Sequence, residues 1–98
     1  MAITENSPEL TKYKFILFVS GMSIKSVKAI ENINKICDNQ LKGKCELQII
    51  DVTNQPHLAR QHQIIGLPTL IKSEPAPARM ILGDLSETEK VLRILNID

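Results

Sequence analysis

Two cysteines are the first residues in this sequence whose chemistry has to be weighed. A dithiol redox centre needs a C-x-x-C pair at the start of a helix, where the positive helix end lowers the pKa of the attacking thiol. Cys37 and Cys45 are separated by seven residues, and no further cysteine is present to complete a metal or disulfide framework. We therefore expect two buried, reduced and inert thiols rather than a redox centre.

Three serines and two histidines are the remaining candidates for catalysis. Ser20, Ser23 and Ser26 follow an apolar run, but nothing in the sequence places a histidine beside them as a general base. His57 and His62 are five residues apart, which is not the i, i+4 spacing that aligns two imidazoles for a metal ion. The sequence predicts no catalytic residue, no metal and no cofactor, and we expect both histidines on a short helix.

The composition limits the possible partners. The 98 residues are 43% hydrophobic and 23% charged, and 12 basic against 11 acidic side chains leave a formal charge of +1. This balance favours neither nucleic acid nor a membrane surface as a partner. No apolar run reaches the ~18 residues of a membrane-spanning helix, and the first residues lack a signal-peptide pattern. We expect a cytoplasmic protein that recognises its partner by shape.

The first half of the chain predicts a strand, a helix and a second strand. Residues 1–12 are polar and are expected to form a flexible tail before a single domain, 13–98. Tyr13–Val19 is an apolar run typical of a strand covered on both faces, and Gly21 ends it. A helical stripe then stops near Gly43, and its apolar members are Val27, Ile30, Ile33, Cys37 and Leu41. The run from Leu47 to Val52 predicts a second strand, parallel to the first.

The second half predicts a short helix, a hairpin and a last helix. Asn54 is expected to cap a helix that starts at Pro56 and ends near Gln63. Thr69–Lys72 and Arg79–Leu82 are expected to pair antiparallel across a proline-rich turn. Gly83 and Asp84 end that hairpin, and Ser86 with Glu89 is typical of a capping box for the last helix.

This order, βαβαββα, predicts an α/β, thioredoxin-like domain around a central mixed four-stranded sheet. Pro68 stands at the entry to the third strand, where thioredoxin-like domains usually have a cis-proline, and we expect the Leu67–Pro68 bond to be cis. The C-x-x-C site of redox-active members is replaced here by the stretch from Ser20 to Ser26.

A specific set of motifs resembles the KaiB family. It runs from about Tyr13 to Leu95 and consists of Phe18-Val19-Ser20-Gly21 with Ser26, Ile50-Asp51-Val52, Pro56, Leu58-Ala59, Pro68-Thr69-Leu70, Lys72 and Arg79 through Gly83-Asp84-Leu85-Ser86. The resemblance implies a non-catalytic, thioredoxin-like protein that binds a hexameric KaiC-type ATPase, in a circadian-clock-derived or stress-adaptation pathway. It also implies partner contacts at Lys28, Lys72 and Arg79, although basic residues on a solvated face would look the same.

Several other residues have two interpretations or a structural one. Asp51 is either a partner contact or the end of its strand. Gly21, Pro68 and Gly83 are interpreted as structural. A turn and a helix cap account for Asp84 and Ser86, so these two are interpreted as structural as well.

The resemblance implies a second possible fold and two rival functions. Clock KaiB proteins also adopt a ground-state fold, often tetrameric, whose C-terminal half is rewired. Where they carry Gly-Leu-Asp, this chain has Ile94-Leu95-Asn96, and an interior glycine costs a helix about 1 kcal/mol, so the thioredoxin-like form is favoured here. Met80 replaces the second of two arginines, and the acidic tail is absent. The rival functions are a sensor domain like that of SasA-type histidine kinases and a glutaredoxin-like thiol protein; a homo-oligomer, dimer or tetramer, is also compatible.

Overall fold

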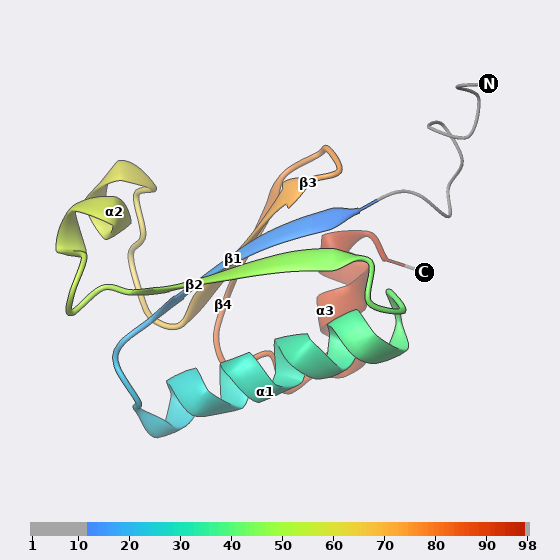
Figure 1. Ribbon diagram of the computed structural model, residues 1–98, viewed down its shortest axis with the longest axis horizontal. Coiled ribbons are helices and arrows are strands. Elements are labelled where there is room, and N and C mark those ends of the chain that lie inside the picture. Colours follow the sequence, from blue (N-terminus) through green and yellow to red (C-terminus); the bar gives the residue numbers. More distant parts are fainter. Residues whose placement is uncertain (1–11, 98) are drawn as a thin grey trace.

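The computed structural model describes residues 12–97, which form a four-stranded sheet and three helices (Figure 1). The predicted tail therefore lies, apart from Lys12, outside the described residues. No helix within residues 12–97 is long and apolar enough to cross a membrane. The elements in chain order are β1 (Tyr13–Val19), α1 (Ile24–Asn39), β2 (Cys45–Asp51), α2 (Pro56–Gln61), β3 (Thr69–Glu74), β4 (Arg79–Leu82) and α3 (Thr88–Leu95).

The sheet has the strand order β2-β1-β3-β4. β2 runs parallel to β1, β3 runs antiparallel to β1, and β4 runs antiparallel to β3. In the predicted hairpin, Thr69 stands opposite Leu82 and Lys72 opposite Arg79. The thioredoxin-like fold with its mixed sheet is thus confirmed, and the rewired alternative is not the arrangement in this structure.

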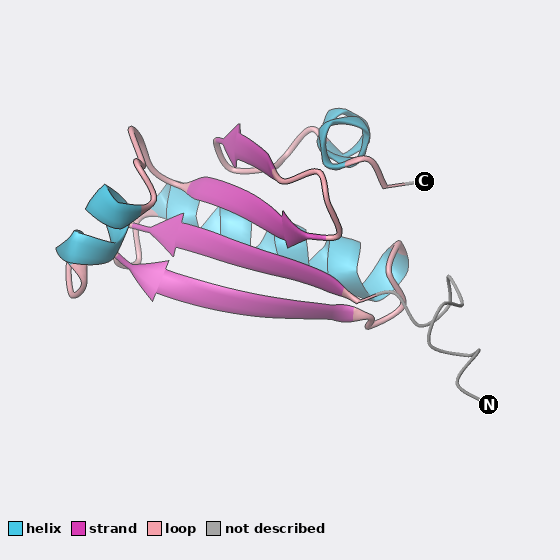
Figure 2. Ribbon diagram, turned by 90° about the horizontal axis from the view of Figure 1, so that it is seen from above, coloured by secondary structure: helices cyan, strands magenta, loops and turns pink. Residues whose placement is uncertain are grey.

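The main core lies between one face of the sheet and the helices α1 and α3, which both cover that face (Figures 1 and 2). Side chains alternate between the two faces of a strand, so Phe15, Leu17 and Val19 of β1 enter this core. Their helical partners in the buried cluster include Ala29, Ile33 and Ile36 of α1 and Val91 and Leu95 of α3. On the opposite face Phe18 is fully buried, with its ring centroid 5.2 Å from that of His62 at the end of α2.

The buried face of α1 differs from the predicted one. Ser26, Ala29 and Ile36 are buried, whereas Val27 and Ile30 of the predicted stripe are only half-buried. A count of large apolar residues misplaces the face because Ser26 and Ala29 are small. The polar group of Ser26 is tolerated inside since its Oγ accepts a hydrogen bond from the backbone N–H of Ser20 at 3.0 Å.

Both predicted caps in the second half of the chain are wrong. The N-cap of α2 is Gln55 rather than Asn54, and no side chain caps that end; the helix also ends at Gln61, two residues early. α3 starts at Thr88, with Glu87 as its N-cap, so Ser86 lies outside the helix. Ser86 belongs instead to the turn before the helix, where its N–H donates to Asp84 Oδ1 at 3.0 Å.

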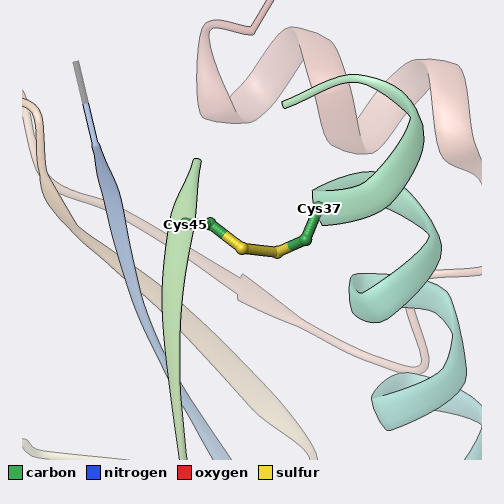
Figure 3. Close-up of a disulfide and its surroundings, with 2 residues drawn as sticks. All are labelled: Cys37 and Cys45. Carbon is green, nitrogen blue, oxygen red and sulfur yellow. A yellow bond between two sulfur atoms is a disulfide. The ribbon is translucent and has the colours of Figure 1, made fainter. Parts of the chain in front are cut away.

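The cysteines are not free thiols as expected. Cys37, in the last turns of α1, and Cys45, the first residue of β2, form a disulfide with their Cα atoms 6.0 Å apart (Figure 3). The tight turn at residues 40–44 reverses the chain and brings the two together, with Gly43 N–H bonded to the carbonyl of Cys37 at 2.8 Å. The expected burial holds only for Cys37, because Cys45 is half-buried.

Loss of this disulfide should destabilise the domain. The bond closes a short loop with a sequence separation of 8, and the chain-entropy model assigns such a loop about 2–3 kcal/mol. We expect the double substitution Cys37→Ala and Cys45→Ala to lower the free energy of unfolding by that amount, as measured by urea denaturation without reductant. The wild-type chain in reductant should show a similar loss, and equal stability of oxidised and reduced wild type would contradict the prediction.

Candidate partner-binding surface

Most of the loops gather at one end of the sheet, which we call the loop end. Phe18, near the end of β1, stands opposite Ile50 of β2 and Thr69 of β3, and Thr69 stands opposite Leu82 at the end of β4. Because β1, β2 and β4 end here and β3 begins here, the connections 20–23, 52–55, 62–68 and 83–87 all leave from this end. α2 and the first three of these connections lie at the left of Figure 1.

The loop between β1 and α1 is held by serine hydroxyls. Ser23 is the N-cap of α1, and its Oγ accepts the N–H of Ser26 at 3.2 Å. The same hydroxyl donates to Ser26 Oγ at 2.8 Å, and Ser26 Oγ accepts the N–H of Ser20. This position holds the redox cysteines in thioredoxin-type enzymes. Here its hydroxyls satisfy backbone groups, an arrangement that builds a rigid loop rather than a nucleophile.

Asp51 ties the end of β2 to this same loop. One carboxylate oxygen, Oδ1, accepts hydrogen bonds from Thr53 Oγ1 at 2.7 Å and from the N–H groups of Thr53 and Gly21 at 3.0 Å each. The Thr53 hydroxyl is the main cause of the lowered pKa of Asp51, and the Thr53 and Gly21 N–H groups lower it further. Gly21 has a positive φ of 55°, which suits glycine at this turn. Of its two predicted roles, Asp51 has the structural one in this geometry.

The connection into β3 passes close to the end of β4. The Leu67–Pro68 bond is cis, as predicted, and Gly83 N–H donates to the Pro68 carbonyl at 2.9 Å. Thr69 Oγ1 donates to the Gly66 carbonyl at 2.6 Å. A Cβ on Gly66 would lie 2.9 Å from a methyl carbon of Leu82, so glycine allows this close approach. Gly66 was not among the predicted structural residues, although its place before Leu67-Pro68 was a signal.

A polar turn joins β4 to α3 and is hydrogen-bonded to α1. Asp84 Oδ1 accepts the N–H of Ser86 at 3.0 Å, and the Asp84 carbonyl accepts Asn32 Nδ2 of α1 at 2.8 Å. Hydrogen bonds from Ser86 are the main cause of the lowered pKa of Asp84, and the charges of Lys28 and Lys25 lower it further. Lys28 thus faces the loop after β4. Asp84 builds a turn as expected, while Ser86 is part of that turn rather than a helix cap.

Large apolar side chains are exposed on three of the segments at the loop end. Of the seven large hydrophobic residues exposed within residues 12–97, five lie there: Met22, Ile24, Ile65, Leu67 and Leu82, which we call the apolar end residues. Ile65 is the extreme case at 91% exposed. Exposed apolar side chains gathered in one region mark interaction sites more often than isolated ones do.

The basic residues predicted as contacts differ in their accessibility. Lys28 on α1 and Arg79 on β4 are exposed, whereas Lys72 on β3 is only 1% exposed. Lys72 points into the main core, where its Nζ lies 6.0 Å from the centroid of the Tyr13 ring. Burial is the main cause of its lowered pKa, and the charge of Arg79 lowers it further. Of the three predicted basic contacts, Lys28 and Arg79 are therefore the ones that a partner can reach in this conformation.

The other predicted site residues have local roles or none in this region. Gly83 has a φ of 126°, a value suited to glycine, and Pro68 is buried. His57 is exposed on α2, while His62 packs on Phe18. Within residues 12–97 no three histidine, cysteine or acidic side chains gather in a way that could hold a metal ion.

Comparison with known protein families and relatives identifies the family to which the chain belongs. Residues 16–97 match the family model described as the KaiB domain. The circadian clock protein KaiB3 of Synechocystis sp. is 46% identical over 81 residues, which cover 83% of this chain and 79% of that protein. The circadian clock oscillator protein KaiB of a Prochlorococcus marinus strain is 44% identical over 80 residues, which cover 82% of this chain and 76% of the relative.

Solved structures agree on the fold. The N-terminal domain of SasA from Synechococcus elongatus superimposes with a TM-score of 0.63 at 24% identity, covering 88% of this chain and 85% of that one. Mitochondrial thioredoxin 3 of Saccharomyces cerevisiae, in its oxidized form, gives a TM-score of 0.68 at 16% identity, covering 91% and 82%. At these identities the likeness concerns the thioredoxin-like fold.

Replacing the buried lysine by an apolar residue should stabilise the domain. Lys72→Met keeps the length of the side chain and removes a buried charge, a change that should raise the free energy of unfolding at pH 7 by about 1 kcal/mol. Because the folded-state pKa of Lys72 lies below its ordinary value of 10.5, wild-type stability should rise toward that pH as the unfolded state holds the extra proton. The advantage of Lys72→Met should therefore shrink between pH 7 and pH 10.5.

Thermal melts across this pH range measure the effect. The exposed Lys44→Met is the matched control, since it loses the same charge without a buried site. A Lys72→Met variant that is less stable than wild type at pH 7 would show that the ammonium group contributes more to the core than its burial costs.

Proposed function

Since the chain belongs to the KaiB family, we propose that it is a non-catalytic, cytoplasmic binding protein whose partner is a KaiC-type ATPase, in a clock-derived or stress-adaptation pathway. The observation that carries the proposal is the set of apolar end residues, exposed on a loop end whose backbone is fixed. A binding module needs accessible apolar side chains on a rigid support, because ordering a loop upon binding costs free energy. The loop end supplies both.

The serine network favours binding over catalysis at this end. Ser23 and Ser26 direct their hydroxyls to each other and to backbone groups, and Asp51 accepts three hydrogen bonds from its neighbours. A catalytic nucleophile needs a base within hydrogen-bond reach and a free lone pair toward the substrate. These groups instead hold the loop that displays Met22 and Ile24.

Two exposed cations, Lys28 on α1 and Arg79 on β4, are proposed as the polar part of the contact. Lys28 lies one turn of α1 before Asn32, whose side chain donates to the carbonyl of Asp84 in the β4–α3 turn at 2.8 Å. Arg79 is the first residue of β4, at the end of that strand away from the loop end. Its guanidinium contacts only the carbonyl of Ala78, at 3.3 Å, among the hydrogen bonds of the described residues. Such charges at the rim of an interface steer association and set its salt dependence.

The disulfide is the one observation that favours a second candidate function, a glutaredoxin-like thiol protein. The bond joins the end of α1 to β2, away from the β1–α1 loop where thioredoxin-type enzymes hold their cysteines. Disulfide reductase activity that disappears in Cys37→Ser would support this candidate. A SasA-like sensor domain has the same fold, and a histidine-kinase region encoded with this domain would favour it.

Removal of one apolar end residue should weaken binding. We expect Ile65→Gln to raise the Kd for a hexameric KaiC-type ATPase with ATP at least tenfold, about 1.4 kcal/mol, because its side chain is accessible for burial in the partner. The measurement is size-exclusion co-elution followed by titration. Ile49→Gln is the matched control, because Ile49 is also exposed, at 45%, but lies within β2. Equal effects of the two variants, or no complex with wild type at tens of micromolar, would refute the proposal.

Charge reversal at the exposed cations tests the polar contacts separately. We expect Lys28→Glu and Arg79→Glu each to slow association several-fold and to flatten its dependence on salt, because a rim charge acts mainly on the encounter. Stopped-flow or surface-binding kinetics at two ionic strengths give the readout. Lys44→Glu changes an exposed lysine just before β2, the sheet edge opposite β4, and should leave the rate unchanged; a loss of the same size there would mean that the effect is net charge alone.

A further inference from the structure

The two residues of the disulfide differ in their exposure to solvent. Cys37 is 5% exposed and belongs to the main core, whereas Cys45 is half-buried at the first residue of β2 (Figure 3). Next to Cys45 lie Lys42, Gly43 and Lys44, all exposed. An attacking thiolate therefore reaches the bond from the side of Cys45, past a turn whose lysines attract negative charge.

The strand that begins at Cys45 is poorly anchored by packing. β2 is an edge strand, with hydrogen bonds to β1 on one side only. Ile50 is its one buried residue and lies near the loop end. In the first half of β2, the residues on the helix side are Cys45 and Leu47, and both are only half-buried. The disulfide is thus the strongest link between this half of the strand and α1.

From these observations the structure assigns Cys37–Cys45 a regulatory role: it is a reducible clamp that a protein dithiol of the thioredoxin class opens, which releases the first half of β2 from α1. We expect a dithiol reductant rather than a monothiol, because the buried Cys37 stays close to Cys45 after the first step. Once Cys45 is bound in a mixed disulfide, Cys37 stays nearby and can re-form the original bond, unless a second thiol on the reductant resolves the intermediate first.

The exchange balances in two steps. A thiolate of the reductant attacks Cys45 Sγ, the Cys37–Cys45 bond breaks, and Cys37 leaves as a thiolate that takes a proton from water. The second thiol of the reductant, as a thiolate, then attacks the reductant's first sulfur, which is bonded to Cys45 in the mixed disulfide. The bond to Cys45 breaks, and Cys45 leaves as a thiolate that takes a proton from water. Two electrons pass from the dithiol to this chain, which gains two thiols while the reductant gains one disulfide.

The released half-strand should open locally more often than the rest of the sheet. Its amides bond to β1 alone, and its side chains contribute little buried surface to oppose opening. Regions with few buried contacts exchange their amide hydrogens through such local openings rather than through global unfolding. Reduction should therefore accelerate the amide hydrogen exchange of residues 45–48 far more than that of residues 50 and 51. The packing of Ile50 and the hydrogen bonds of Asp51 hold those two residues in place.

The first part of the test concerns the reductant. The full oxidised chain is incubated with a catalytic amount of thioredoxin, its reductase and NADPH, and in parallel with glutathione, and free thiols are counted by the mass shift on maleimide labelling. We expect two labelled thiols within minutes with thioredoxin, at a rate at least tenfold above that with glutathione. A bond that resists thioredoxin for hours, or a chain that does not form the bond in oxidised glutathione, would overturn the assignment.

The second part concerns the consequence for β2. Hydrogen exchange of oxidised and reduced chains is followed by mass spectrometry or NMR. We expect exchange of the protected amides in residues 45–48 to accelerate at least tenfold more than that of β1 amides. The variant Cys45→Ser, in which no bond can form, should match the reduced chain in either buffer. Acceleration by one common factor in β1 and β2 would indicate global destabilisation only and would refute the clamp.

Discussion

The burial of β1 is the constraint on which the rest of the structure depends. This strand lies between β2 and β3, and its second half is buried on both faces. Leu17 and Val19 fix α1 and α3 on one side, while Phe18 meets the residues around α2 on the other. Because neighbouring strands are registered on β1, the same contacts decide where each loop leaves the sheet. A surface built from those loops therefore inherits its geometry from three buried side chains.

The loop after β1 shows how this family member keeps the frame of a thioredoxin-like fold without redox cysteines in that loop. In the loop, backbone N–H groups turn toward Ser26 Oγ and Asp51 Oδ1, which come from the first turn of α1 and the end of β2. The polar groups are satisfied internally, so the outward positions are free to be apolar. Met22 in this loop is 81% exposed, so the loop displays an apolar side chain to solvent rather than a thiol.

Local patterns in the sequence predicted the strands. They did not predict the features that depend on how one segment of the chain packs against another. β1 and β4 have the predicted bounds, and β3 starts at the predicted Thr69 but runs on to Glu74, because apolar runs and turn prolines are local signals that fix most strand ends. The face of α1 was predicted correctly at Ile33 and Cys37 but not at Ser26 and Ala29, because small residues carry no apolar weight. Ser86 belongs to the turn before α3 through its hydrogen bond with Asp84, and the spacing of a capping box does not reveal such a turn. The disulfide depends on the tight turn at residues 40–44, and a spacing of eight residues alone does not imply contact.

The candidate surface was predictable in the same uneven way. Residue type and family resemblance pointed to Lys28, Lys72 and Arg79 alike, but only the packing of β3 separates the buried Lys72 from the two exposed cations. The loop end, which carries the apolar end residues, and the disulfide lie at opposite ends of β2. A strand of seven residues is about 20 Å long, so this length separates them. Ile50 and Asp51 stand between them, fixed by packing and by hydrogen bonds from Gly21 and Thr53. Under the proposed clamp, reduction of Cys45 therefore alters the first half of the strand and stops at these anchors, so the edge of the sheet responds to reductant while the loop end keeps its shape for the proposed partner.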